Sequence, residues 1–176
     1  MTVFSDSHIQ LASASDIPAI KDLLNSAYRG ERSRKGWTTE ADLIAGNVRT
    51  DEQNLAEVMA VSGSVFLKYT SDAGVIQGCV NLQVQGERVY LGMFSVDPDL
   101  QGAGIGKIIL KAADEYARSQ ACSSIYMSVI SVRSELIAWY QRHGYVDTGA
   151  RKPFKEDGLT GKHLRELEFM ILEKPL

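Results

Sequence analysis

The chain of 176 residues contains only two cysteines, Cys79 and Cys122, and has no C-x-x-C spacing. We therefore expect two buried free thiols in a reducing compartment. No apolar run approaches the roughly 20 residues that a membrane-spanning helix needs. The segment Met1–Gln10 has neither a basic start nor an apolar block, so we expect no signal peptide. The chain is predicted to be cytoplasmic, without a membrane partner.

The sequence also lacks a strong excess of either charge. Its formal net charge is -3, and charged residues make up 23%. Nucleic-acid-binding domains usually carry a basic patch, so we expect no nucleic-acid partner. Histidine is scarce, and His143 and His163 have no neighbours that suggest metal ligation, so we expect no metal site. The length and the apolar fraction of 44% fit one domain over residues 1–176.

The hydrophobic periodicity changes along the chain, from helical in the first third to strand-like in the middle. We expect helices at 17–29, 38–47, 105–119 and 133–142, and leave 51–60 open between helix and loop. We expect strands at 8–12, 64–69, 75–84, 88–96, 124–129, 145–148 and 165–173. This order predicts an α/β (α+β) fold with a mixed, mostly antiparallel sheet flanked by helices.

The most informative stretch is the glycine-rich segment VDPDLQGAGIGK at residues 96–107, between a strand and a helix. Gly102, Gly104 and Gly106 remove every second Cβ, so backbone N–H groups can approach a ligand closely. The helix that follows directs the positive end of its dipole at the same place. The segment therefore predicts an anion site, with a pyrophosphate as its natural occupant.

Two common phosphate-binding signatures do not fit this segment. The pattern G-x-x-x-x-G-K-[ST] fails because Gln101 takes the first glycine position and Ile108 follows Lys107. The pattern G-x-G-x-x-G, begun at Gly102, would need glycine at Lys107. The string Q-x-x-G-x-G after a V-x-P strand end instead resembles the pyrophosphate-binding signature of the GNAT superfamily of N-acetyltransferases.

A second stretch agrees with this resemblance. The sequence ELIAWYQRHGY at residues 135–145 is similar to the family's later motif, a helix that carries an aromatic-Tyr pair and closes in Gly-aromatic. Gly144 suits the left-handed position that ends a helix. The resemblance covers roughly residues 90–148, and the N-terminal helices only by their order.

The resemblance implies that the strand before the glycine loop splays from its neighbour and opens a cleft for an acyl-CoA, with acetyl-CoA as cosubstrate. A backbone N–H at or next to Phe94 would face the thioester carbonyl and stabilise the oxyanion. The strand positions implied in cofactor binding are Phe94, Ser95 and Val96. The loop positions implied in holding the pyrophosphate are Gln101, Gly102, Ala103, Gly104, Ile105, Gly106 and Lys107.

The resemblance also assigns catalytic roles and leaves some open. Tyr140 matches the family's general acid, because a phenol stays protonated at neutral pH and can protonate a leaving thiolate. A primary amine would attack directly, without a covalent acyl-enzyme. Some relatives use a glutamate as base near the position of Tyr90 here, so the base stays open between Glu31, Glu87 and water. Arg133 replaces a common asparagine and is a candidate contact to cofactor or substrate, with capping or exposure as alternatives.

The acceptor site is expected in the loop at 29–40, where Glu31 or Glu40 could hold an ammonium group, an arginine a carboxylate, and Trp37 could stack. The acceptor stays open between a small molecule, a peptide N-terminus and a lysine. A homodimer through an exposed strand at 165–173 is a further expectation. Two rivals are a catalytically weak acyl-CoA-binding regulatory module of the same fold, and a nucleotide kinase.

Overall fold

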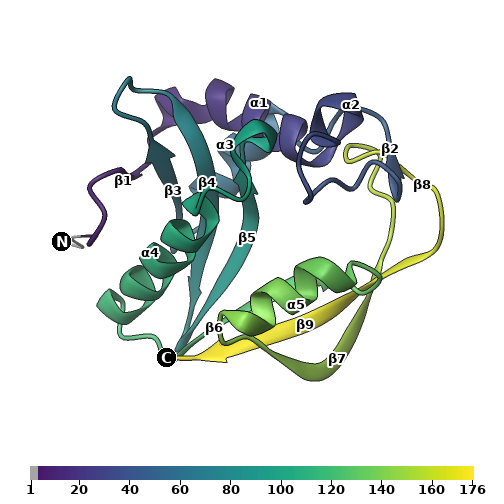
Figure 1. Cartoon of the computed structure of the whole chain (residues 1–176). Coiled ribbons are helices and arrows are strands. Elements are labelled where there is room, and N and C mark those ends of the chain that lie inside the picture. The colour runs from purple at the N-terminus through teal and green to yellow at the C-terminus, as the bar shows by residue number, and fades with distance from the viewer. Residues whose placement is uncertain (1–3) are drawn as a thin grey trace.

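The structure is a computed structural model that describes residues 4–176, and a seven-stranded sheet runs through it (Figure 1). The strand order is β1-β3-β4-β5-β6-β9-β7, and every neighbouring pair is antiparallel except β5 and β6. The strands are β1 Ile9–Leu11, β3 Ser64–Thr70, β4 Ile76–Gln85, β5 Arg88–Val96, β6 Ser124–Ile130, β7 Val146–Phe154 and β9 Leu167–Pro175. The predicted mixed, mostly antiparallel sheet is confirmed.

Helices cover both faces of the β3–β5 part of the sheet because alternate residues of a strand point to opposite faces. Phe66 and Cys79 pack with α1 and α3, whereas Leu67 and Val80, one position further on each strand, pack with α4. The helices are α1 Ile17–Tyr28, α2 Gly30–Ser33, α3 Glu52–Ala60, α4 Ile105–Ser119 and α5 Ser134–Arg142. The apolar positions of α1 and α4 recur at helical spacing and are buried, as the periodicity predicts.

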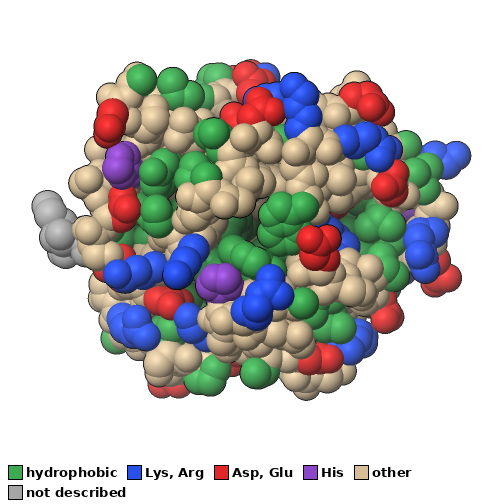
Figure 2. Space-filling view, in the orientation of Figure 1, with side chains coloured by type: hydrophobic (Ala, Val, Ile, Leu, Met, Phe, Trp, Pro, Cys, Tyr) green, Lys and Arg blue, Asp and Glu red, His purple; other side chains and the backbone are tan. Residues whose placement is uncertain are grey.

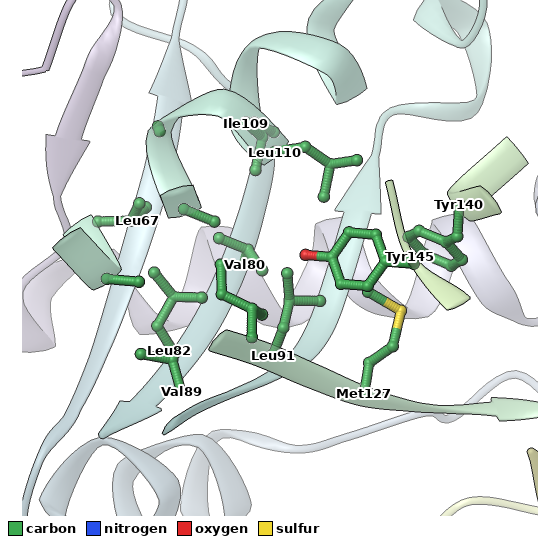
Figure 3. Close-up of a cluster of buried hydrophobic side chains, with 14 of the residues drawn as sticks. Leu67, Val80, Leu82, Val89, Leu91, Ile109, Leu110, Met127, Tyr140 and Tyr145 are labelled. Atoms are coloured by element: carbon green, nitrogen blue, oxygen red, sulfur yellow. The ribbon is translucent and has the colours of Figure 1, made fainter. Parts of the chain in front are cut away.

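The core on the α4 side continues to α5 and to the strands beyond β5. In Figure 3, Tyr140 and Tyr145 lie side by side at the edge of this cluster, and their ring centroids are 5.8 Å apart. Met127 contributes to the same cluster from β6. This packing fixes α5 against the sheet and thereby fixes Tyr140.

The parallel pair β5 and β6 separates partway along its length. The two strands pair only at Arg88–Ser124, Val89–Ile125 and Tyr90–Tyr126, although β5 continues to Val96. Figure 1 shows the two strands diverging from the end that lies near the C-terminus. The predicted splayed strand pair is therefore confirmed.

Several expected elements differ from the structure. Residues 38–47 form turns and the short strand β2 (Ile44–Ala45), which pairs with β8 (Lys162–His163), so the predicted helix there is wrong. The segment left open at 51–60 is the helix α3, because the Asp51 side chain caps it by accepting a 2.7 Å hydrogen bond from the Asn54 N–H. The charged loop contains the one-turn helix α2.

The late strand is also placed differently from the prediction. The strand β9 lies between β6 and β7 and pairs with both, so it has no unpaired edge for a second subunit. The edge strand on that side is β7. Both cysteines are free and buried, as predicted. Over residues 4–176, no helix has the length and hydropathy to span a bilayer. The first three residues of the Met1–Gln10 segment, where no signal peptide is expected, lie outside the described residues.

Candidate functional site

A cavity of about 470 Å³, here called the main cavity, opens between the splayed end of β5 and the helices α4 and α5. Figure 2 shows a hollow on this face with hydrophobic side chains on its wall and Lys and Arg side chains beside it. Most predicted cofactor positions line it, namely Phe94, Ser95, Val96, Gln101, Gly102, Gly104, Gly106, Lys107 and Tyr140. Ala103, Ile105 and Arg133 do not line it.

The glycine loop presents unpaired backbone donors to the main cavity. In the part of the chain that the structure describes, the N–H groups of Gly102, Gly104, Gly106, Ile105 and Lys107 have no hydrogen-bond acceptor. Gly102 and Gly104 both have φ +91°, and a Cβ at either would meet nothing within 4 Å. Glycine is therefore favoured at these two positions by its backbone conformation and not by a lack of space.

The loop is held in shape by the side chain of Gln101. Its Nε2 donates to the Thr38 hydroxyl at 2.7 Å and to the Val96 carbonyl at 3.0 Å, and its Oε1 accepts from the Thr38 N–H at 3.2 Å. A Cβ at Gly36 would lie 2.2 Å from Gln101 Oε1, so a larger residue there would displace the Gln101 side chain. The side chain of Gln101 therefore braces the loop against Thr38 and the end of β5.

The strand β5 has a bulge where it enters the main cavity. Cys79 pairs with Ser95 and Asn81 with Gly92, so the single residue Val80 faces Met93 and Phe94 together. Met93 adopts φ 47°, which is unusual for a residue other than glycine. A bulge leaves an extra residue outside the ladder and bends the strand, and here it coincides with the predicted oxyanion donor at Phe94.

Aromatic rings form one wall of the main cavity. Trp139 contacts Phe94 and Trp37 in T-shaped pairs, with ring centroids 6.0 Å apart in each case. It also lies 4.4 Å from the ring of His143, whose Nδ1 is hydrogen-bonded to the Trp139 carbonyl. Trp37, predicted to contact the acceptor, therefore lies on the wall of the main cavity.

Tyr140 lies where the main cavity meets a second one. Its side chain is only 6% exposed, and its hydroxyl has no hydrogen-bond partner within residues 4–176. Burial, followed by the nearby Tyr28 hydroxyl, raises the pKa of Tyr140 well above its ordinary value. The phenol is therefore protonated at any physiological pH, as a general acid requires.

The second cavity, here called the small cavity, has a volume of about 120 Å³. It shares four lining residues with the main cavity, namely Tyr28, Phe94, Leu136 and Tyr140. Tyr28, which the sequence reasoning missed, lies at the end of α1, and burial raises the pKa of its hydroxyl. The two cavities thus meet at the aromatic residues of β5, α1 and α5.

Glu40 is held between two arginines at the small cavity. Its Oε1 accepts a hydrogen bond from Arg29, and its Oε2 accepts one from Arg133 Nη1 at 3.0 Å. Arg133 also donates to the Thr38 carbonyl. The side chain of Arg29 is fully buried, and those of Arg133 and Glu40 are 9% and 11% exposed. Arg133 therefore positions the Thr38–Glu40 segment from the start of α5.

The other acidic candidates lie elsewhere. The Glu31 side chain is 93% exposed, pairs with Arg34 and lines neither cavity. Glu87 lies in the turn between β4 and β5 and lines neither cavity, whereas Tyr90 lines the small one. Among the residues described, no group of three or more His, Cys, Asp or Glu side chains could hold a metal ion.

Residues 17–145 match the family described as Acetyltransferase (GNAT) family. Human N-acetyltransferase 8B is 26% identical over 123 residues, which cover 66% of this chain and 53% of that protein. The spermine/spermidine N(1)-acetyltransferase of Bacillus subtilis is 38% identical over 63 residues, which cover 35% of this chain and 41% of that protein. The chain thus spans about half the length of the curated relatives it matches.

A solved structure agrees at the level of the fold. The phosphinothricin acetyltransferase of Sinorhizobium meliloti, in complex with AcCoA, superposes with a TM-score of 0.69 at 16% identity. The superposition covers 96% of this chain and 87% of that one. The family match spans well over half of the sequence and includes the glycine loop and Tyr140. The chain belongs to the Acetyltransferase (GNAT) family.

Proposed function

We propose that the chain is an acetyl-CoA-dependent N-acetyltransferase that transfers an acetyl group to a primary amine by direct attack. The observation that carries this proposal is the meeting of two cavities at Tyr140, one beside the unpaired donors of the glycine loop and one lined by Glu40, Arg49 and Arg133. A two-substrate reaction needs two such binding sites around one reacting centre. Membership of the acetyltransferase family supports the same reaction.

The donors around the glycine loop fit the diphosphate of coenzyme A. Five backbone N–H groups without acceptors and the N-terminus of α4 favour an anion there. Lys107 and Arg142 also line the main cavity and add positive charge. The thioester would supply the activated acetyl group.

In this mechanism the protein positions groups and handles one proton. The amine nitrogen bonds to the thioester carbonyl carbon, the C–S bond breaks, and the released thiolate takes a proton from Tyr140, which solvent then restores. A backbone N–H at Phe94 would stabilise the oxyanion, an effect worth about 3 kcal/mol when preorganised. The attacking nitrogen gives up its proton to water.

Direct attack is supported by the state of the cysteines. Burial raises the pKa of Cys79 to about 12, and the residue lines neither cavity. Cys122 also lies outside both, and burial raises its pKa. A thiol that stays protonated and away from the cavities is a poor nucleophile.

Water is the proposed base. Glu40 is the one carboxylate on the small cavity within residues 4–176, and both of its oxygens accept hydrogen bonds from arginines. Both Glu40 oxygens are therefore already engaged by the arginines. The lack of a free carboxylate on the small cavity, among the described residues, favours the second candidate function, a regulatory module that binds acyl-CoA without efficient turnover. A cytoplasmic location remains a prediction.

The test is Tyr140→Phe, which removes the hydroxyl and keeps the ring. We expect acetyl-CoA affinity within a few fold of the parent and turnover, measured by thiol release over a panel of amines, reduced at least about tenfold. Tyr69→Phe is the matched control, because Tyr69 lines neither cavity. Equal turnover in both variants would remove Tyr140 from the mechanism. Absence of turnover in the parent, with intact cofactor binding, would favour the regulatory module.

A further inference from the structure

The small cavity is lined by a guanidinium group that has no hydrogen-bonded partner among the described residues. Its charged lining residues are Glu40, Arg49 and Arg133. Glu40 and Arg133 are paired with each other, and Arg29 takes the second Glu40 oxygen. The guanidinium of Arg49, in contrast, forms no hydrogen bond or ion pair with any residue from 4 to 176.

Arg49 is nonetheless held firmly through its backbone. Asn25 of α1 accepts hydrogen bonds from the Arg49 N–H at 2.6 Å and from the Thr50 N–H at 2.9 Å. Its Nδ2 donates to the Thr50 carbonyl at 3.1 Å. Asp51, which follows Thr50, caps α3. The main chain therefore fixes the start of the Arg49 side chain beside α1, while the guanidinium stays available at the cavity.

The nearby carboxylates form no hydrogen bond with the Arg49 guanidinium. Asp157 lies within electrostatic range of it. The Asp157 carboxylate instead accepts hydrogen bonds from the N–H groups of Leu159 and Thr160, at 2.9 and 2.8 Å. Glu40 is occupied by its two arginines. No carboxylate is thus hydrogen-bonded to the Arg49 guanidinium within the described residues, and its donors stay available to a ligand.

Apolar side chains form part of the small-cavity wall, among them Leu91, Met93, Met127, Val129, Phe154 and Phe169. A guanidinium binds a carboxylate through two parallel hydrogen bonds. An apolar wall favours an apolar group on the same molecule. A polyamine would need free carboxylates for its ammonium groups, and the described residues of this cavity provide none.

We propose that the acceptor is a small primary amine that carries both a carboxylate and an apolar group, such as an apolar amino acid, with its carboxylate bound by Arg49. The proposal rests on the proposed function and names the substrate class of that site. The amine end then lies towards Phe94 and Tyr140, which border both cavities. A peptide N-terminus fits less well, because an amide replaces the carboxylate.

The experiment compares L-leucine and L-phenylalanine with their amides and with spermidine as acceptors, using acetyl-CoA and the full chain. We expect kcat/KM for each acid to exceed that for its amide by about tenfold or more. Arg49→Gln should remove most of this preference. Arg118→Gln is the control, because Arg118 is exposed near the end of α4 and lines neither cavity.

Binding of the same amines is also measured by calorimetry in the presence of coenzyme A, so that recognition is read without turnover. Tighter binding of the acids that disappears in Arg49→Gln supports the proposal even if no thiol is released, in which case only the proposed function fails. Turnover of amides or spermidine as efficient as that of the acids overturns the proposal and leaves the function intact. Failure of both acids to bind also overturns it.

Discussion

The replacement Glu40→Gln tests the buried charge cluster of Glu40, Arg29 and Arg133 at the small cavity. Glu40 has two arginine partners, and Arg29 has no solvent exposure at all. Glutamine keeps the shape of the side chain and removes its charge. Both guanidinium groups would then remain buried without a counter-ion, since neither has another carboxylate partner within the described residues.

The expected loss of stability is large for one substitution. Removing one partner of a buried ion pair costs about 3–5 kcal/mol, because it leaves an uncompensated charge. Two charge-assisted hydrogen bonds, each contributing roughly 1.5–3 kcal/mol, give a similar total. With a denaturant slope of about 2 kcal/mol per molar urea, the unfolding midpoint should fall by about 2 M.

Urea unfolding followed by tryptophan fluorescence measures this change, because Trp37 and Trp139 contact each other beside the cluster. Glu31→Gln is the matched control, since its side chain is 93% exposed, and its midpoint should equal that of the parent. A fall in the Glu40→Gln midpoint of less than about 0.5 M would mean that the cluster is solvated, and the reasoning would be refuted.

Two further predictions concern proton handling and the glycine loop. Burial raises the pKa of Tyr140, so its phenol stays protonated to higher pH. The value of kcat/KM should therefore rise as the amine loses its proton and should not fall again below about pH 10. A fall in kcat/KM near neutral pH would contradict this prediction. Gln101→Leu removes three hydrogen bonds that join Thr38 and Val96 to the loop. The affinity for acetyl-CoA, measured by calorimetry, should therefore fall about tenfold. An unchanged affinity would show that the loop does not need this brace.

The central part of the fold could be predicted from the sequence because its signals are local. The helix α4 has the predicted bounds, since its apolar spacing is regular and a glycine loop precedes it. The strand β5 ends where predicted, before Pro98. Most of the predicted cofactor positions, which line the main cavity, could be predicted from the same glycine-rich motif.

The helix predicted at 38–47 does not form, because tertiary contacts outweigh the local helix signals of this segment. Thr38 and Glu40 are bound by Gln101 and Arg133, which lie 63 and 93 residues away. Such distant partners leave no trace in hydrophobic periodicity. The segment 51–60 was left open between helix and loop, although Asp51 and Asn54 stand at cap spacing, a signal that the sequence did contain. The role of Arg49 depends on a cavity that several elements form together.

The account depends most directly on the unpaired backbone donors of the glycine loop. Calorimetric titration with acetyl-CoA and with ATP tests them in the parent, in Gly104→Val and in Gly74→Val. Gly74 shares a positive φ and open surroundings with Gly104 but lies in the turn between β3 and β4. We predict one acetyl-CoA site per chain, weakened at least about tenfold only by Gly104→Val, and no comparable binding of ATP. Equal affinity for ATP, or acetyl-CoA binding that Gly104→Val leaves unchanged, would contradict the account.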